Sequence, residues 1–229
     1  TLKAHARAGI TLAAKNHFGS HVRGDASHLH NGLVSQPPDG DNPTRIGYGL
    51  YRVQVDIMGH KYLGAKTMLV LVDGLYPCDE AVAPPGKWNM EPFNGDWASS
   101  IFLSQDQVAI ESVCFDFLRT EYNGDTPETS RPNWSGVDDY LHQAADSSNW
   151  PEDIIYDPNG EGVLIPSLGV HEHWNKTIDI FAYPEGKYNL DIIKKTIDAG
   201  YRRAVTTEAP INILVNNNHY NRKVLDMIY

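Results

Sequence analysis

The stretch SSIFLSQDQVAIESVCFDFLRTEY, residues 99–122, holds both kinds of secondary structure on which the fold depends. Its first residues, SSIFLS, form a short apolar run that is typical of a buried strand. The run passes directly into apolar residues at helical spacing, and Ser104 and Gln107 predict a capping box at the start of that helix. A strand followed at once by an amphipathic helix favours an α/β fold, in which helices cover a sheet.

A second strand of the same kind precedes this stretch. Residues 67–76 read TMLVLVDGLY, and the unbroken apolar run 68–72 before Asp73 predicts a strand that is buried on both faces. We therefore expect residues 68–72 and 101–103 to be neighbouring or near-neighbouring strands of one sheet, with the helix 108–118 packed on it.

The rest of the chain alternates between short periodic segments and loops rich in Pro, Gly and Asn. Further helices are predicted at 48–61, 138–145 and 190–199, and a late strand at 211–215. The predicted fold class is α/β, a sheet with helices packed on it and long irregular loops. We expect one domain over residues 1–175 and a C-terminal extension, residues 176–229, that packs on the same domain.

The composition is that of a folded, acidic protein. Of 229 residues 41% are hydrophobic and 21% are charged, which is enough apolar material for a buried core. The 29 acidic residues outnumber the 19 basic ones, whereas a nucleic-acid partner requires a face rich in Lys and Arg. No apolar run approaches the roughly 18 residues that span a bilayer, so membrane insertion is not expected.

Cysteine usage and cofactor motifs exclude several classes of protein. Cys78 and Cys114 are the two cysteines and lack CxxC spacing, which excludes a disulfide scaffold and a cysteine-based zinc ribbon. One disulfide or two buried thiols remain the alternatives. The chain contains no GxGxxG, P-loop or GxSxG pattern, and therefore no motif for a nucleotide cofactor.

Histidines are concentrated near the start of the chain, where residues 15–32 read KNHFGSHVRGDASHLHNG. Neutral imidazoles with a carboxylate are the usual ligands of zinc and similar divalent metals. A second His-x-His pattern, in GVHEHW, could meet the first in space. No closed motif such as HExxH is present, so histidines that cap loops or face water are the alternative. The candidate metal ligands are His17, His21, Asp25, His28, His30, His171 and His173.

Residues 157–162, DPNGEG, have the pattern of the first half of a calcium-binding loop. Asp157, Asn159 and Glu161 stand at positions one, three and five, and a glycine follows at six. Leu168 occupies position twelve, which rules out an EF-hand. A shorter calcium loop and a plain Asp-Pro-Asn-Gly turn remain the two interpretations.

Three charged side chains are candidates for catalysis. Asp73 ends one predicted strand and Asp106 opens the helix after the other, and ligands of α/β proteins bind near such strand and helix ends. Lys15 could supply a cation to the same site. The ordinary alternatives are that Asp73 forms a turn, that Asp106 stabilises the start of the helix and that Lys15 is a solvated surface charge.

Several segments, in their order along the chain, resemble bacterial proteins of domain-of-unknown-function family 362. The segments are GITLAAKNHFGSH, GDASHLHNGLV, VDIMGHKYLGAKTMLVLVDGLY and WASSIFLSQDQVAIESVCFDF. The similarity covers about residues 2–119 and extends to about residue 175 through DDYLHQAADSSNW and SLGVHEHW.

The resemblance implies that the chain is a fragment of a larger α/β protein, with a missing upstream region as its partner. It also implies export to the periplasm or the cell exterior. Some relatives carry iron–sulfur segments, but this chain lacks the four-cysteine run, so no cluster is implied. No reaction comes with the family. The family-like positions are Lys15, Asn16, Asp73, Gly74, Asp106 and Glu111.

Two hypotheses for the function remain. In the first, the chain is a metal-dependent enzyme of the hydrolase or lyase type, in which Lys15, Asp73 or Asp106 acts as acid, base or substrate anchor. In the second, it is a non-catalytic module that binds carbohydrate or peptide through its Trp and Tyr residues, with metal-stabilised loops. A small-molecule or carbohydrate ligand fits either. A structural metal site is closed by protein ligands, whereas a catalytic one keeps an open position.

Overall fold

The computed structural model describes residues 1–21, 24, 26–35, 44–171, 173–174, 180–182 and 203–205. The chain divides into two compact units, Thr1–Trp174 and Asn175–Tyr229. In the second unit, β5 (Ile180–Ala182) and β6 (Arg203–Val205) pair in parallel. The predicted helix 190–199 and strand 211–215 lie outside the described residues. None of the helices described is long and apolar enough to cross a membrane.

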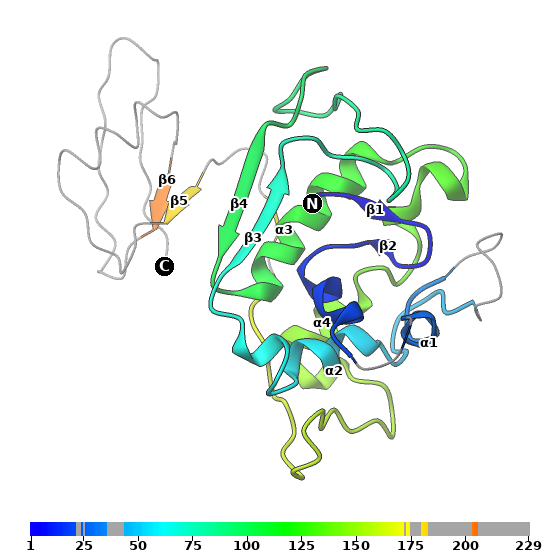
Figure 1. Ribbon diagram of the computed structural model, residues 1–229, viewed down its shortest axis with the longest axis vertical. Coiled ribbons are helices and arrows are strands. Elements are labelled where there is room, and N and C mark those ends of the chain that lie inside the picture. The colour runs from blue at the N-terminus through cyan, green and yellow to red at the C-terminus, as the bar shows by residue number, and fades with distance from the viewer. Residues whose placement is uncertain are drawn as a thin grey trace. The chain divides into compact units, whose positions relative to one another are not determined.

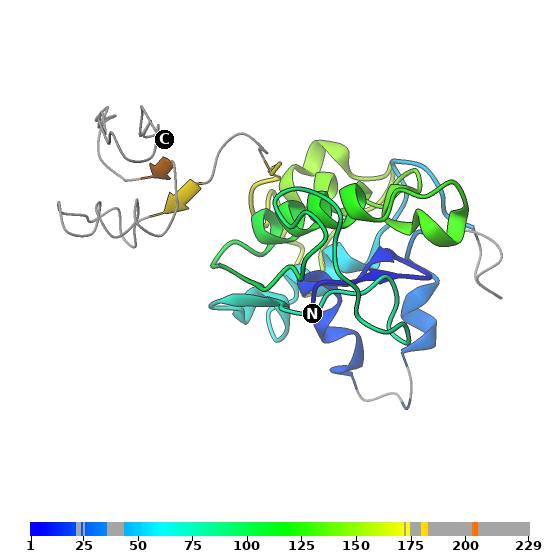
Figure 2. The ribbon, with the colours of Figure 1, turned by 90° about the horizontal axis from the view of Figure 1, so that it is seen from above.

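An antiparallel two-stranded ribbon forms one side of the first unit (Figure 1). Its strands are β3 (Val70–Gly74) and β4 (Ser100–Ser104), paired so that Leu71 lies opposite Leu103. Helix α3 (Gln107–Glu121) covers one face of this ribbon, as Figures 1 and 2 show. The rings of Phe102 and Phe117 meet edge to face at that contact, with centroids 5.4 Å apart. The predicted pairing of the two strands and the packing of the helix on them are confirmed.

The other face of the ribbon is exposed, so the prediction of a strand buried on both faces is wrong. Val70 and Val72 are 5% and 3% exposed, whereas Leu71 and Leu103 are 58% and 59% exposed. Successive side chains of a strand point to opposite faces, and α3 covers only one of them. The apolar run therefore belongs to a one-sided antiparallel ribbon and not to a central parallel strand.

Asp106, and not Ser104, caps the start of α3. The Asp106 carboxylate accepts hydrogen bonds from the N–H groups of Val108 and Ala109, at 2.8 and 2.9 Å. The Ser104 hydroxyl oxygen accepts from the Asp106 N–H at 3.0 Å instead. The predicted capping box is therefore wrong, although the predicted helix is present and extends over 15 residues.

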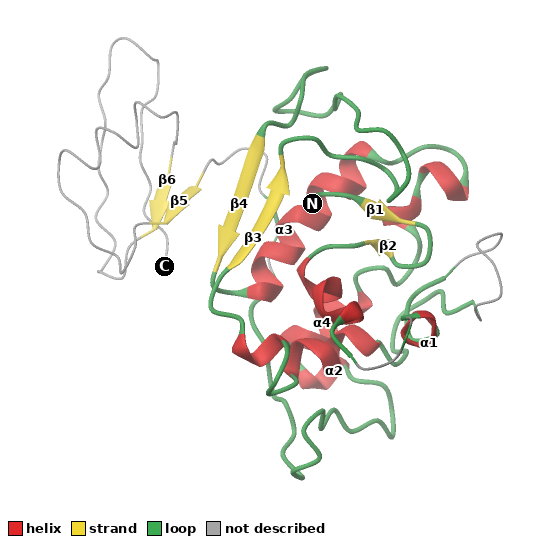
Figure 3. Cartoon of the chain, viewed as in Figure 1, coloured by secondary structure: helices red, strands yellow, loops and turns green. Residues whose placement is uncertain are grey.

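Short elements complete the first unit (Figure 3). Helix α4 (Asp139–Ala145) agrees with the predicted helix, and α2 (Val53–Gly59) is shorter than predicted because the backbone before it bonds to Asp139. The remaining elements are β1 (Ala4–His5), β2 (Gly9–Ile10), η1 (Ala13–Gly19), α1 (Ser27–His30), η2 (Gly64–Lys66), η3 (Pro127–Thr129), η4 (Arg131–Asn133) and η5 (Ser147–Asn149).

The core of the first unit lies between α3, α4, α2 and the inner face of the ribbon. Trp88, Phe115 and Leu118 are almost fully buried in it. Cys78 and Cys114 are also buried and are not joined in a disulfide, which decides between the two alternatives for the thiols. Helices, small antiparallel sheets and long irregular loops together confirm the predicted α/β class.

Candidate metal centre

Three side chains with metal-binding atoms meet beside α4. Asp138 immediately precedes the helix and His142 lies one turn into it, so that both project from one face. The distance from His142 Nε2 to Asp138 Oδ2 is 3.7 Å. His171 reaches them from a later loop, and its ring meets that of His142 edge to face with centroids 4.5 Å apart. We call these three residues the His–Asp triad; its candidate ligand atoms lie within 4.8 Å of one another.

The loop that carries His171 is anchored to the start of α3. Asp106 Oδ2 accepts a hydrogen bond from the Val170 N–H at 2.9 Å, while Oδ1 caps the helix. The loop approaches so closely that a Cβ atom on Gly169 would lie 2.1 Å from Asp106 Oδ1. A side chain at position 169 would therefore displace the anchor next to His171.

The hydrogen bonds of Ser112 fix the protonation of His171. The Ser112 hydroxyl donates its single proton to the carbonyl oxygen of Val108 at 2.8 Å, so its oxygen must accept from His171 Nδ1–H, also at 2.8 Å. His171 Nε2 is then the unprotonated nitrogen. This atom is buried and has no hydrogen-bond partner among the described residues. A buried lone pair without a partner costs free energy, and a bound cation removes that cost.

The other members of the His–Asp triad are also oriented. Tyr48 Oη donates to Asp138 Oδ1 at 2.7 Å, which leaves Oδ2 facing His142. Burial and this hydrogen bond raise the pKa of Tyr48 to about 12, so the hydroxyl remains a donor. Burial, with the neighbouring His142 and His173, lowers the pKa of His171 to about 4. The ring is therefore neutral at physiological pH, which is the form that binds metals.

Two imidazoles and one carboxylate form a donor set that suits a divalent transition metal such as zinc. Bonds of about 2.0–2.2 Å allow two ligand atoms to lie at most about 4.4 Å apart. A small inward rotation of the rings would therefore close the His–Asp triad on an ion. Three protein ligands leave one position of a tetrahedral ion for water or substrate.

One of the predicted metal ligands belongs to the triad and another lies beside it. His171 is a member, and the ring of His173 lies 5.0 Å from that of His171. His173 is exposed, and its Nδ1 is 3.1 Å from Asp116 Oδ2. Sequence reasoning missed Asp138 and His142. Their i,i+4 spacing in DDYLH, on a helix that was predicted, is the signal that could have found them.

The structure divides the four N-terminal histidines among three sets of contacts. His17 Nδ1 lies 3.2 Å from the hydroxyl of Ser20. The rings of His21 and His28 meet edge to face, with centroids 4.9 Å apart. His30 Nε2 lies 3.5 Å from Lys15 Nζ. The remaining predicted ligand of this segment, Asp25, lies outside the described residues.

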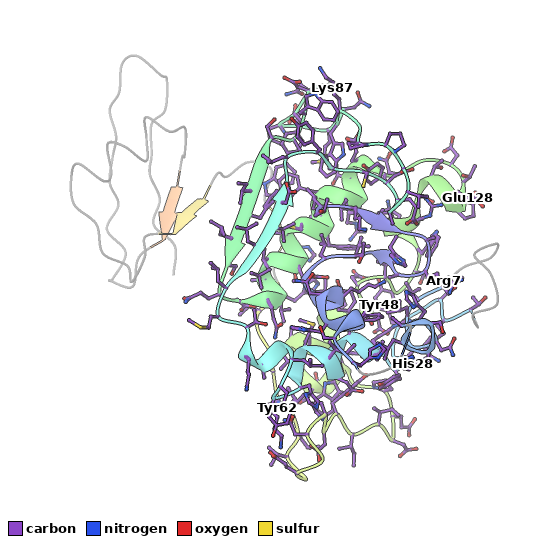
Figure 4. The ribbon with its side chains drawn as sticks, viewed as in Figure 1. Arg7, His28, Tyr48, Tyr62, Lys87 and Glu128 are labelled. Carbon is purple, nitrogen blue, oxygen red and sulfur yellow. The ribbon has the colours of Figure 1, made fainter. Side chains whose placement is uncertain are left out.

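Lys15 lies between two imidazoles, one of which sequence reasoning missed. Its Nζ is 3.0 Å from His5 Nε2 and 3.5 Å from His30 Nε2, and it lies 4.8 Å from the ring centroid of Phe18. We call Lys15, His5 and His30 the lysine cluster. No local pattern predicts His5 as a partner of Lys15, because the turn between β1 and β2 determines where β1 lies. In Figure 4, Arg7 and His28 mark this side of the unit, where β1, β2 and α1 come together.

The two predicted catalytic carboxylates have structural hydrogen bonds. Asp73 Oδ1 accepts from the Leu75 N–H at 2.9 Å and closes the turn after β3. Asp106 caps α3 and anchors the His171 loop. Among the hydrogen bonds and ion pairs of the described residues, none joins either carboxylate to Lys15. Both carboxylates thus have a structural role in these hydrogen bonds, and a catalytic role for Lys15, Asp73 and Asp106 stays a prediction.

The oxygens of the predicted calcium loop are engaged in a hydrogen-bonded turn. Asp157 accepts from the N–H groups of Glu161 and Gly162, at 3.1 and 2.6 Å. Asn159 Oδ1 accepts from the Lys61 N–H at 2.8 Å, and Glu161 pairs with the Lys61 ammonium. These bonds are those expected of an Asp-Pro-Asn-Gly turn. Calcium binding at this loop stays a prediction.

Comparison with known proteins gives one match. The family described as "Domain of unknown function (DUF362)" matches residues 1–116. No curated protein and no solved structure matches the chain. The lysine cluster lies within the matched region, whereas the His–Asp triad lies beyond it.

Proposed function

Because the chain belongs to the DUF362 family, for which no function is known, we propose from its own geometry that it is a metal-dependent enzyme of the hydrolase or lyase type. The proposed metal ligands are Asp138, His142 and His171. One observation carries the proposal: the lone pair of His171 Nε2 is buried and unpartnered in the described part of the chain, while Ser112 holds the opposite nitrogen. A metal-binding histidine usually has such a second hydrogen bond on its other ring nitrogen.

The neighbouring residues supply what hydrolysis or elimination needs besides the ion. A divalent ion at this site would polarise a carbonyl or phosphoryl oxygen or lower the pKa of a bound water. Tyr48 donates a hydrogen bond to one oxygen of Asp138, so that the other oxygen would bind the ion. His173 is exposed and is oriented by Asp116, which makes it the candidate to exchange a proton with a group at the open position.

Metal analysis tests the site directly. The chain is stripped with a chelator, reconstituted with zinc or cobalt(II), desalted and measured by elemental mass spectrometry. We expect the wild type to retain one ion per chain and His171→Ala or His142→Ala to lose it. His17→Ala removes an imidazole whose Nδ1 lies 3.2 Å from the Ser20 hydroxyl and which is not one of the proposed ligands, so it is the matched control. Equal retention by the wild type and His171→Ala would overturn the proposed site.

A second experiment separates an enzyme from a binding module with metal-stabilised loops. Acetohydroxamate is added to the cobalt(II) form while the visible spectrum is recorded. A spectral change shows that the ion has an open position, as catalysis requires. If the spectrum is unchanged and removal of the ion by a chelator lowers only the melting temperature, then the ion has a structural role and not a catalytic one. With an open position, we expect cleavage of carboxylic or phosphoric esters that His171→Ala abolishes.

A further inference from the structure

The lysine cluster contains a second chemical feature, independent of the His–Asp triad. His5 Nδ1 accepts a hydrogen bond from the backbone N–H of Arg7 at 2.9 Å. A neutral imidazole carries one proton, so the proton of His5 must be on Nε2. This Nε2–H points at Lys15 Nζ across 3.0 Å. The lysine nitrogen must therefore accept this bond, which an ammonium group cannot do.

His30 has the opposite arrangement. Its Nδ1 lies 2.9 Å from the carbonyl oxygen of Ala26, which can only accept, so Nδ1 carries the proton. His30 Nε2 is then an acceptor and faces Lys15 Nζ at 3.5 Å. Lys15 thus accepts from His5 and donates to His30, which is the pattern of a neutral amine between two neutral imidazoles.

The surrounding charges favour the same state. Burial is the largest cause that lowers the pKa of Lys15, to about 7, and the positive charges of Lys3 and Arg7 add to it. Glu80 and Glu111 act in the opposite direction and do not cancel the shift. A desolvated lysine next to other cations is the usual form of an activated amine nucleophile.

A cavity next to the lysine cluster could hold a reaction partner. Lys15 and Lys3 both line a space of about 310 Å³ beside β3, together with Thr11 and Asn16. The volume is sufficient for a small metabolite, at the lower end of ligand pockets. Lys3 adds a positive charge to the lining, so an occupant with an anionic group is favoured.

We propose that Lys15 is a nucleophilic lysine that takes up a small carbonyl compound with an anionic group, an aldehyde or a keto acid, as a Schiff base in this cavity. The reaction needs no metal ion and does not depend on the His–Asp triad.

The step balances with the groups that are present. Lys15 Nζ turns its lone pair from His5 Nε2–H to the carbonyl carbon, and the electron pair of the C=O bond moves to the oxygen. One nitrogen proton passes to His30 Nε2 and from there to that oxygen. The second nitrogen proton leaves with the oxygen as water when the C=N bond forms. Water is the single by-product, and no oxidant or reductant takes part.

The test is reductive trapping on the whole chain in the presence of a chelator, so that its outcome is separate from that of the metal experiments. Glyoxylate and sodium cyanoborohydride are added over a series of pH values, and the modified lysines are found by peptide mass spectrometry. We expect Lys15 to be the first lysine modified, with a midpoint near pH 7. Modification of Lys15 at the same rate as exposed Lys66, or only at alkaline pH, would overturn the proposal.

Variants separate reactivity from an effect on folding. Lys3→Gln should move the Lys15 midpoint to higher pH, because Lys3 lowers that pKa. It should also remove the preference for glyoxylate over uncharged propanal. His30→Gln retains a polar side chain but loses the proton acceptor, so trapping at Lys15 should slow while the melting temperature changes little. Trapping that is insensitive to both changes would contradict the assigned roles.

Discussion

Glu111 Oε1 accepts a hydrogen bond from the hydroxyl of Tyr140 at 2.7 Å, and both side chains are almost completely buried. The second oxygen of Glu111 accepts from the Ala14 N–H at 3.0 Å. One carboxyl group on α3 therefore holds both η1, in which Lys15 follows Ala14, and α4, which carries His142. The lysine cluster and the His–Asp triad are positioned through the same buried side chain.

Glu111→Gln should change how stability depends on pH. Burial raises the pKa of Glu111 to about 7, from an ordinary value of 4.5. A raised pKa contributes stability that is present below pH 4.5 and is lost as the pH rises through about 7. The glutamine variant does not titrate, so it does not lose this stability as the pH rises. The unfolding free energy of the variant minus that of wild type should therefore increase between pH 4.5 and 7 by on the order of 3 kcal/mol. Urea denaturation across the window measures this.

The matched control for that experiment is Glu128→Gln, which changes an exposed carboxyl on η3 (Figure 4). The two variants are measured at the same pH values. If the unfolding free energy of Glu111→Gln relative to wild type does not change with pH, then Glu111 does not titrate in this range.

Ser112→Ala should weaken metal binding without removing a metal ligand. The change takes away the acceptor of His171 Nδ1–H, which fixes the orientation of the ring. Loss of such a supporting bond typically costs about 10–100-fold in metal affinity. Competition with a chromophoric chelator gives the affinity. Thr120→Val removes a comparable hydroxyl from the same helix, one that donates to the Asp116 carbonyl, and should leave the affinity within experimental error.

Asp139→Asn should strongly destabilise the first unit. Arg52 Nε lies 2.9 Å from Asp139 Oδ2, and the two side chains are 1% and 3% exposed. In the variant the Arg52 guanidinium stays buried without a negative charge beside it. Such a loss typically lowers the unfolding free energy by about 3–5 kcal/mol. Chemical denaturation provides the value. Lys87→Gln, which breaks an exposed ion pair with Asp96, should be indistinguishable from wild type. A small effect of Asp139→Asn would mean that water reaches Arg52.

Two leucines test the one-sided burial of the ribbon and its helix. Leu118 on α3 is 0% exposed, whereas Leu71 on β3 faces outward. Leu118→Ala should lower the unfolding free energy by about 2–5 kcal/mol through lost contacts and a cavity. Leu71→Ala should change it by no more than about 0.5 kcal/mol. Comparable losses at both positions would show that the outer face of the ribbon is covered in solution.

Local patterns predict the elements of this chain better than they predict its sites. The apolar runs and the helical spacing after residue 104 identify β3, β4 and α3 because they depend on near neighbours in the sequence. They do not reveal that α3 covers one face of the ribbon only, since the cover of a strand depends on how distant parts of the chain pack. Leu71 was therefore predicted to be buried and is exposed.

The candidate sites depend on distant contacts. His171 is oriented by Ser112, 59 residues earlier, and meets Asp138 and His142 from another element. The density of histidines between positions 17 and 30 predicts a metal site near the start of the chain, but density does not determine where each imidazole points. The i,i+4 pair in α4 was less conspicuous and more informative, because a helix fixes the relative directions of two side chains.

Asp106 has a consequence for how the first unit fluctuates. Its carboxylate holds the first turn of α3 and the Val170 N–H together, so the helix cannot fray there without releasing the loop of His171. An ion that binds only the intact arrangement suppresses such local opening by mass action. The amides of Val108 and Ala109 should then exchange with solvent more slowly as the ion concentration rises. Hydrogen exchange at the start of α3 would thereby report how much of the His–Asp triad is occupied by the ion, although the start of α3 contributes no ligand.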